Sequence, residues 1–266
     1  MKALATQAAY SPFLERLRSA PERILMLDYD GTLAPFVPDR HLAVPYPGIM
    51  PLIARIMSSG TRVVFISGRK AREVADLIGM LPSPEIWGSH GMERLTPDGR
   101  YSLAPEAGSR DAAFAAAVKS LQGKVDKEAE ERLEIKPGSI AVHWRGLDPA
   151  RAGKLKEEAS HLWLPLLAQY GLELHEFDGG LELRVPGHDK GQAVRTILAE
   201  AGPDAALAYL GDDRTDEDAF RALGHAGLTV LVRPEPRPTA AELWLQPPNE
   251  LIHFLEEWLH ACGGEA

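Results

Sequence analysis

The chain of 266 residues lacks several features that would place it in other classes of protein. Its single cysteine, Cys262, excludes an intrachain disulfide and a thiolate metal cage. No run approaches the roughly 18 uninterrupted apolar residues of a membrane helix, so we expect no membrane contact. With 29 basic and 38 acidic residues, the net charge of −9 argues against a nucleic-acid partner. Any anionic ligand must therefore be held locally, by selected cations or by a metal.

The remaining absences concern metal type, location and assembly. No spacing of histidine and cysteine suggests zinc. The apolar stretch after Lys2 is interrupted early and followed closely by charged residues, which makes it a poor secretion signal. No hydrophobic stripe requires a dimer. We therefore expect a cytoplasmic monomer.

Short apolar runs alternate with helical patterns at both ends of the sequence. This alternation is typical of parallel strands with helices on both faces of the sheet, and it predicts a doubly wound, Rossmann-like α/β core. The predicted strands are 23–28, 61–67, 85–90, 206–211 and 227–232, and the predicted helices are 48–58, 70–80, 190–200 and 215–223.

The middle of the chain has a different pattern. A long helix predicted at about 106–130 precedes two strands with a turn at Lys136-Pro137-Gly138, and a helix at about 149–170 precedes a second strand pair. This doubled helix-strand-strand unit indicates an inserted α+β domain. We therefore expect a core of 1–103 and 184–266, and a cap of 104–183 that acts as a lid.

Two aspartates follow the first predicted strand, in "ILMLDYDGTLAP" (24–35). Ligands of open α/β sheets bind beyond the carboxyl ends of the strands, and Asp28 and Asp30 lie there, two positions apart on one face. Such a pair needs a shared cation or a shared proton. Capping of the strand end is the simpler alternative. A calcium loop does not fit, because Gly31 is fourth instead of sixth and a strand precedes it.

Two further motifs indicate an anion site. Ser67, Gly68 and Arg69 stand just before a predicted helix, where a hydroxyl and free backbone N–H groups can hold an anion, although Ser67 can also be a plain helix cap. Lys190 opens another helix, where the helix dipole disfavours a cation unless an anion lies nearby. A solvated surface lysine is the alternative.

The segment "LGDDRTDEDAF" (210–220) carries five acidic residues after a predicted strand. Acidic residues commonly cap helices, so some of the five are structural, but five exceed that need. Asp212 stands at the strand end, as Asp28 does. Converging carboxylates with only oxygen ligands suggest Mg²⁺.

In their order and position, Asp28-Tyr-Asp30-Gly-Thr-Leu, Ser67-Gly-Arg69, Lys190 and Gly-Asp212-Asp213 resemble the motifs of the haloacid dehalogenase (HAD) superfamily of phosphatases. The resemblance extends to the trehalose-6-phosphate phosphatases. The segments that carry it are "GSHGME" (88–93), "EIKPGSIAVHWR" (134–145), "GGLELRV" (179–185) and "GDDRTDEDAF" (211–220), which with the motifs above span most of the chain.

The resemblance implies hydrolysis of trehalose 6-phosphate through an aspartyl-phosphate. Asp28 would be the nucleophile and Asp30 the general acid and base, while Ser67 and Lys190 would bind the phosphoryl oxygens. Mg²⁺ would be held by Asp28, the backbone carbonyl of Asp30 and Asp212. Asp213 and Asp216 would support the site, Asp216 through a metal-bound water or by orienting Lys190.

Sugar recognition is expected chiefly from the cap. By strand periodicity, side chains at 134, 136, 143 and 145 can form one polar face, although an ordinary solvated face is the alternative. The resemblance makes Glu182 an acceptor for glucose hydroxyls, while Arg184 would contact the phosphate or link the domains. His90 would line the site or be structural. The expected substrate-binding residues are Gly68, Arg69, His90, Glu134, Lys136, His143, Arg145, Glu182 and Arg184.

Two other functions stay open at this point. The same chemistry can act on another sugar phosphate, of the sucrose or mannose phosphate type, including as a phosphomutase. A sugar-phosphate sensor without turnover is a different class, and the intact set of Asp28, Asp30, Lys190 and Asp212 argues against it.

Overall fold

The chain divides into two structural units. The structure is a computed structural model that describes residues 7–37, 40–108, 110–125, 127–177 and 179–264. The first unit comprises Met1–Tyr101 and Asp189–Ala266, and the second comprises Ser102–His188. The predicted boundaries differ from these at both ends, since 102–103 and 184–188 belong to the second unit. The reason at the second boundary is that Arg184 is the last residue of a strand of that unit, where it pairs with Ser139 and Glu173.

The first unit is built on a sheet whose strand order is β12-β11-β10-β1-β2-β3-β4-β5. The pairs from β12 to β3 are parallel, and β4 is antiparallel to β3. This confirms the predicted doubly wound α/β core. The strands are β1 (Arg23–Leu27), β2 (Arg62–Ile66), β3 (Glu85–Gly88), β4 (Glu93–Leu95), β5 (Tyr101–Leu103), β10 (Ala206–Gly211), β11 (Leu228–Val232) and β12 (Leu243–Leu245). The division between the two units falls within β5, after Tyr101.

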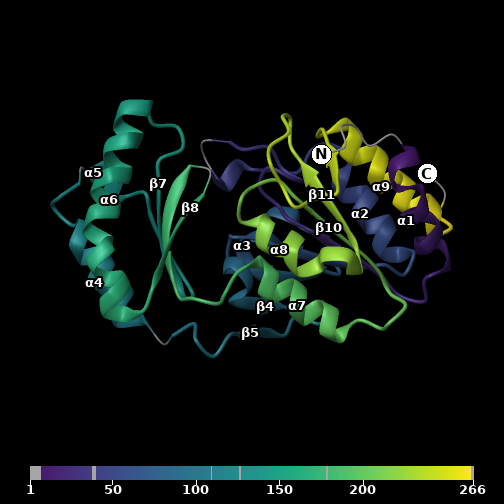
Figure 1. The fold of residues 1–266 in the computed structure, drawn as a ribbon, viewed down its shortest axis with the longest axis horizontal. Helices are drawn as coiled ribbons and strands as arrows, with labels where there is room; N and C mark the ends of the chain where they lie inside the picture. Colours follow the sequence, from purple (N-terminus) through teal and green to yellow (C-terminus); the bar gives the residue numbers. More distant parts are fainter. Residues whose placement is uncertain (1–6, 38–39, 109, 126, 178, 265–266) are drawn as a thin grey trace. The chain divides into compact units, whose positions relative to one another are not determined.

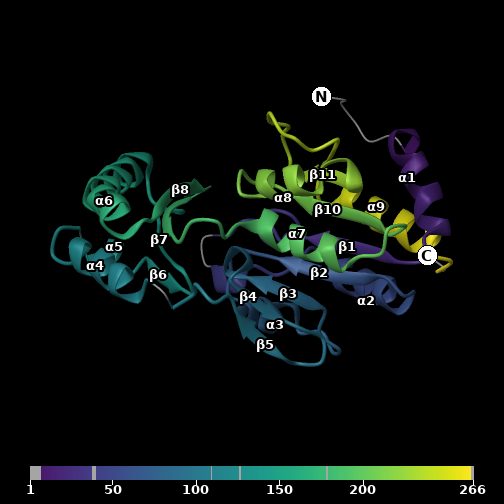
Figure 2. The same cartoon turned by 60° about the horizontal axis from the view of Figure 1, so that its bottom comes forward.

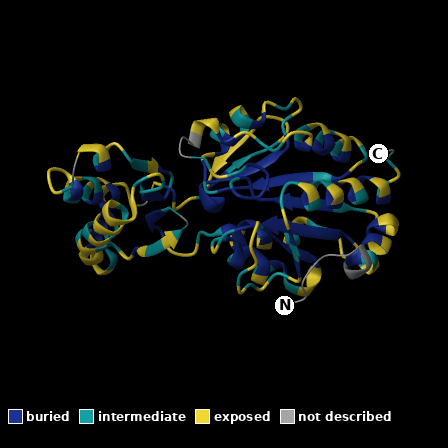
Figure 3. Ribbon diagram, turned by 90° about the horizontal axis from the view of Figure 1, so that it is seen from above, coloured by how far each residue is buried: buried dark blue, intermediate teal, exposed yellow. Residues whose placement is uncertain are grey.

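Helices cover both faces of this sheet (Figures 1 and 2). Strand β1 alternates between two cores, with Leu25 and Leu27 in one and Ile24 and Met26 in the other, as parallel strands buried on both sides do. The buried strands run through the middle of the unit in Figure 3. The first core packs against α1 (Gln7–Ser19), α2 (Ile49–Ser58), α3 (Ala71–Ile78) and α9 (Asn249–Ala261), and the second against α7 (Lys190–Glu200) and α8 (Asp216–Leu223).

The second unit has its own antiparallel sheet of order β6-β7-β9-β8. The predicted long helix at 106–130 is wrong, because the described residues form α4 (Asp111–Leu121) and a separate short α5 (Lys127–Glu130). Gly123, at φ +68°, lies between them in a backbone conformation that ends a helix. The other elements are β6 (Leu133–Lys136), β7 (Ser139–His143), α6 (Pro149–Tyr170), β8 (Glu173–Phe177) and β9 (Gly180–Arg184).

One face of this small sheet packs on helices, while the opposite face is polar. Ile140 pairs with Leu183 and Val142 with Leu181, and these buried side chains share the face covered by α4 and α6 (Figure 2). Because successive side chains of a strand point to opposite faces, Glu182 lies on the other face. The strand alternation thus separates the core of the unit from its polar surface.

Candidate functional site

Three carboxylates meet at the carboxyl edge of the first sheet. Strands β1 and β10 are parallel neighbours, so Asp28 and Asp212, which follow them, emerge side by side. Each of Asp28, Asp212 and Asp216 offers an oxygen atom within 4.8 Å of the other two. All three side chains are buried. Folding therefore brings together the two aspartates that the sequence placed at separate strand ends.

A buried lysine lies between two of these carboxylates. Lys190 Nζ donates to Asp28 Oδ1 and to Asp216 Oδ1, each at 2.7 Å. The lysine is only 3% exposed, which excludes a solvated surface residue. It begins α7 because Asp189 caps that helix by accepting from the Gln192 N–H. Its ammonium compensates charge on both carboxylates.

Asp216 is held by four donors. Its Oδ1 accepts from Lys190 Nζ and the Tyr209 hydroxyl, and its Oδ2 accepts from the backbone N–H groups of Asp212 and Asp213. Of the two roles expected for Asp216, the structure shows the contact with Lys190. Tyr209 was missed by sequence reasoning, because a tyrosine inside a buried strand carries no signal of a functional contact.

Asp212 provides the clearest indication that a cation fits this site. Its Oδ1 is buried and has no hydrogen-bond partner among the residues that the structure describes. Buried polar atoms rarely lack a hydrogen-bond partner, because the hydrogen bonds that they lose with water would not be replaced. On the other side, Gly31 adopts φ +83°, and a Cβ there would lie 2.2 Å from Asp212 Oδ2. The absent side chain leaves room for the carboxylate.

The electrostatics of the cluster also favour a cation. Burial raises the pKa of Asp28 to about 7, against the lowering effect of Lys190 and with a further raising effect of Asp216. Burial and the neighbouring Asp28 raise the pKa of Asp212 well above its ordinary value. Burial alone would lower the pKa of Lys190, but Asp216 and Asp28 outweigh it and raise the pKa. A bound divalent cation would relieve this excess of negative charge.

We expect Mg²⁺ to stabilise the protein more at pH 8 than at pH 5.5. The pKa of Asp28 is about 7 in the folded protein and about 4 in the unfolded chain. The protonated carboxyl therefore stabilises the fold fully below about pH 4, and this contribution is lost as the pH rises through about 7. The metal-free protein is therefore less stable at pH 8, where Mg²⁺ does not compete with protons for the carboxylates. Thermal unfolding with Mg²⁺ and with a chelator at both pH values measures this. An equal or larger shift at pH 5.5 would contradict it.

Asp30 forms a bidentate ion pair with Arg69. Arg69 Nε donates to Asp30 Oδ2 at 2.6 Å and Nη2 donates to Oδ1 at 2.7 Å, while Nη1 contacts Glu73. The guanidinium also lies over the Tyr29 ring. The structure shows that Arg69, which was predicted to bind substrate, holds the predicted acid and base in place. Sequence reasoning missed this pair because its partners lie on different strand ends.

Ser67, Gly68 and His90 pack together after β2. Ser67 is buried, and its hydroxyl accepts from the Arg69 N–H at 3.2 Å. It is not the cap of α3, which Lys70 precedes. His90 lies over Gly68, where a Cβ would be 2.7 Å from the imidazole ring. Gly68 is thus required by packing against His90.

The polar face of the second unit contains a buried ion pair. Lys136 Nζ lies 2.8 Å from Glu182 Oε1, which also accepts from the Ser139 hydroxyl at 2.9 Å. His143 Nε2 lies 2.9 Å from Glu134 Oε2. Since Lys136 and Glu182 are 6% and 1% exposed, an ordinary solvated face does not describe them. Four of the predicted sugar-binding residues therefore form one cluster.

The two arginines predicted for the second unit lie outside the contacts just described. Arg145 packs beside Gly179, where a Cβ would lie 3.0 Å from its side chain. Arg184 is 6% exposed, and its Nε has no hydrogen-bond partner within the described part of the chain.

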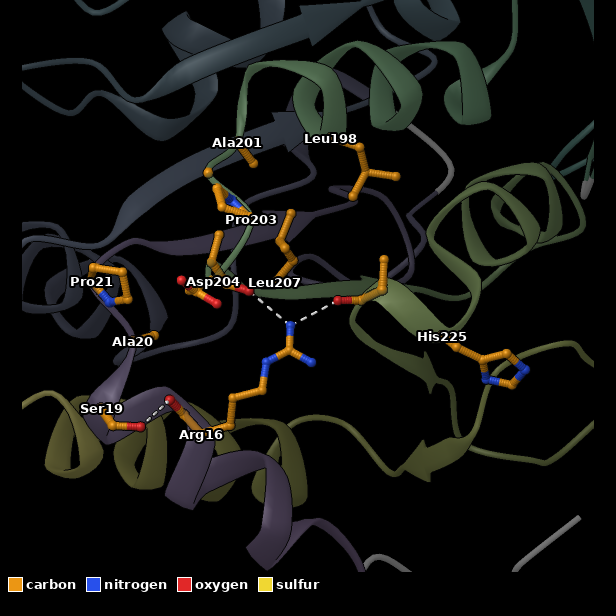
Figure 4. A pocket seen from close by; sticks show the side chains of 13 residues that line it. Arg16, Ser19, Ala20, Pro21, Leu198, Ala201, Pro203, Asp204, Leu207 and His225 are labelled. Carbon is orange, nitrogen blue, oxygen red and sulfur yellow. Dashed lines mark hydrogen bonds between the residues drawn. The ribbon is translucent and has the colours of Figure 1, made fainter.

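A pocket of about 730 Å³ lies at the opposite edge of the first sheet and is distinct from the carboxylate cluster (Figure 4). Pro21 and Ala205, which line it, precede β1 and β10, whereas Asp28 and Asp212 follow them. Arg16 Nη2 donates across the pocket to the carbonyl oxygens of Ala205 and Ala226. This arginine therefore connects α1 to the segments that precede β10 and β11.

Comparison with known proteins places these features in one family of sequences. A sequence model of the trehalose-phosphatase family matches residues 26–248. The trehalose-phosphate phosphatase of Mycobacterium ulcerans is 30% identical over 248 residues, which cover 89% of this chain and 61% of that protein. Trehalose-phosphate phosphatase B of Arabidopsis thaliana is 31% identical, with 91% of this chain and 68% of that protein covered. The chain thus spans about three fifths of the Mycobacterium relative.

Solved structures share the fold. The C-terminal domain of trehalose-6-phosphate phosphatase from C. albicans superposes with a TM-score of 0.76 at 20% identity, covering 96% of this chain and 97% of that one. A phosphatase of the HAD superfamily from Bacteroides thetaiotaomicron superposes with a TM-score of 0.60 at 18% identity, covering 97% of this chain and 99% of that one. The predicted HAD-like fold is therefore confirmed. Among the described residues, no helix has both the length and the apolar content to span a bilayer.

Proposed function

The chain belongs to the trehalose-phosphatase family, and from this premise we propose that it is a phosphoric monoester hydrolase that converts trehalose 6-phosphate to trehalose and phosphate with Mg²⁺. The observation that carries the proposal is the buried arrangement of Asp28, Asp212, Asp216 and Lys190. It combines a carboxylate nucleophile, an ammonium and an unpartnered oxygen atom suited to a cation.

We propose Asp28 as the nucleophile. Its carboxylate attacks phosphorus, the bond from phosphorus to the sugar oxygen breaks, and an aspartyl-phosphate forms that water then hydrolyses. Lys190, already 2.7 Å from Asp28, neutralises charge on the transferring group. The Thr32 hydroxyl donates to Asp28 Oδ2 at 3.2 Å and orients the carboxylate. Mg²⁺, held by Asp28, the Asp30 carbonyl and Asp212, would supply charge neutralisation.

We propose Asp30 as the group that moves protons. It would protonate the departing sugar oxygen and later take a proton from the attacking water. Its bidentate contact with Arg69 fixes the carboxyl group beyond the end of β1, while Glu73 fixes the guanidinium. Arg69 therefore contributes by positioning Asp30, and Ser67 would donate to the phosphoryl oxygens.

Substrate choice is proposed to depend on the second unit. A carboxylate and an ammonium group that share a buried cluster are suited to a sugar diol, since the carboxylate accepts from one hydroxyl and the ammonium donates to the other. Glu182 and Lys136 supply this pair. His143, Glu134, Arg145 and Arg184 extend the polar set. His90 and Gly68 would contribute in the first unit.

We expect Glu182→Gln to raise KM for trehalose 6-phosphate on the order of 10- to 100-fold, because a charge-assisted acceptor is replaced by a neutral amide. The rate with p-nitrophenyl phosphate, which has no sugar, should stay unchanged. Steady-state phosphate release measures both. Glu173→Gln, at an exposed position of the neighbouring strand, is the matched control. A parallel loss with both substrates would contradict a role in sugar selection.

A panel of sugar phosphates tests the proposal as a whole. With Mg²⁺ present, phosphate release should be fastest from trehalose 6-phosphate and slower from sucrose, mannose and glucose 6-phosphates. Equal rates across the panel would defeat the substrate assignment. Transfer of the phosphoryl group to a second sugar would indicate a phosphomutase. Tight binding without release would indicate a sensor.

A further inference from the structure

Two arginines that follow β11 contact the backbone of the loop that carries Asp212. Arg237 donates from Nε to the carbonyl oxygen of Asp212 at 3.3 Å and from Nη2 to that of Asp213 at 2.6 Å. Arg233 donates from Nη1 to the same Asp212 oxygen at 3.2 Å. A guanidinium is planar, and its donors point in fixed directions. One arginine can therefore hold two successive carbonyl groups in a defined arrangement.

Arg237 is itself fixed by Glu217. Its Nη1 donates to Glu217 Oε1, and the same carboxylate accepts from the Thr239 hydroxyl at 2.7 Å and the Ala240 N–H at 2.8 Å. Glu217 is 8% exposed, and the Arg237 side chain is 16% exposed. One of the five acidic residues of "LGDDRTDEDAF" thus anchors an arginine instead of facing the carboxylate cluster.

The peptide between Asp212 and Asp213 is consequently held at both ends. Its carbonyl oxygen accepts from Arg233 and Arg237, and its N–H donates to Asp216 Oδ2 at 2.9 Å. Rotation of this peptide plane would break contacts on both sides. The backbone of Asp212 is therefore fixed, and with it the carboxylate beside Gly31.

We propose that Arg237 is a positioning residue for a divalent cation, because it holds the Asp212 and Asp213 carbonyl groups and so sets the Asp212 carboxylate. The inference rests on the proposed function only in treating the carboxylate cluster as a metal site. Charge and position predict opposite effects. Removing a cationic side chain near a cation site should tighten metal binding by charge alone, whereas losing the contacts to the two carbonyls should weaken it.

Titration of the full chain with Mn²⁺ at pH 8, followed by electron paramagnetic resonance of the free ion, separates the two effects. We expect Arg237→Gln to raise the Kd for Mn²⁺ about 10- to 100-fold. Arg100→Gln is the matched control, since it removes one positive charge from the first unit at a side chain that is 82% exposed and outside the contacts of Glu217. Its Kd should equal that of the wild type. A Kd for Arg237→Gln equal to or lower than the wild-type value would overturn the proposal.

A second variant keeps the test decisive if the glutamine variant does not fold. Arg237→Lys retains the charge beside Glu217, but its single ammonium cannot hold both carbonyls, so we expect an intermediate loss of Mn²⁺ affinity. Wild-type affinity in this variant would overturn the positioning role, and so would a wild-type chain that binds no Mn²⁺. If the wild type binds Mn²⁺ but hydrolyses no sugar phosphate, the proposed function fails while the titration still decides the role of Arg237.

Discussion

Replacing Asp28 by asparagine is expected to lower the rate of phosphate release from trehalose 6-phosphate by on the order of 10⁴- to 10⁶-fold, the range seen when a nucleophile is removed. The amide cannot form the acyl phosphate, although it retains the shape of the carboxylate. Lys190 keeps its contact with Asp216, so the fold should persist. Steady-state phosphate release and the far-ultraviolet circular dichroism spectrum measure the two expectations.

The exposed Asp76 provides the matched control, because Asp76→Asn makes the same chemical change on the surface of α3. That variant should keep the wild-type rate and thermal midpoint. Phosphate release by Asp28→Asn at a rate close to that of the wild type would remove Asp28 from the role of nucleophile. Unfolding of Asp28→Asn would instead show that its buried carboxylate is needed for the fold.

Replacing Lys190 by methionine is expected to lower the free energy of unfolding of the metal-free protein at pH 8 by about 3–5 kcal/mol, the usual cost of leaving buried charge without its partner. The ammonium contacts Asp28 and Asp216, and both carboxylates are almost fully buried. Activity should also be lost, because no other described side chain occupies this position between the two carboxylates. Urea unfolding followed by circular dichroism measures the change.

The loss of stability should depend on pH and on metal in a defined direction. Burial and Asp216 raise the pKa of Asp28, and the variant lacks the lowering effect of Lys190, so at pH 5.5 the carboxyl takes up a proton and the loss of stability should shrink. Millimolar Mg²⁺ at pH 8 should restore part of the stability, since it supplies positive charge to the same cluster. Lys154→Met, at a side chain that is 76% exposed, is the control and should leave the free energy of unfolding unchanged. A penalty that is equal at both pH values would contradict this account.

The positions of the core elements could be predicted from sequence because each depends on local pattern. Alternating apolar runs and helical stretches located β1, β2, β10 and α7 to within a residue or two. The long helix predicted in the second unit failed at Gly123, where a single residue of positive φ outweighs the surrounding helical composition. The short β12 escaped prediction, because three residues carry too little periodicity.

The sequence by itself determined that Asp28 and Asp212 follow neighbouring parallel strands, and this topology brings both residues to one edge of the sheet. Tertiary structure alone decided how the groups are paired. Lys190 lies 162 residues from Asp28, and Arg237 lies 25 residues from Asp212. Such contacts depend on the packing and rotamers of distant segments, which have no period in the sequence. For the same reason the contact between Arg69 and Asp30 could not be predicted from the sequence.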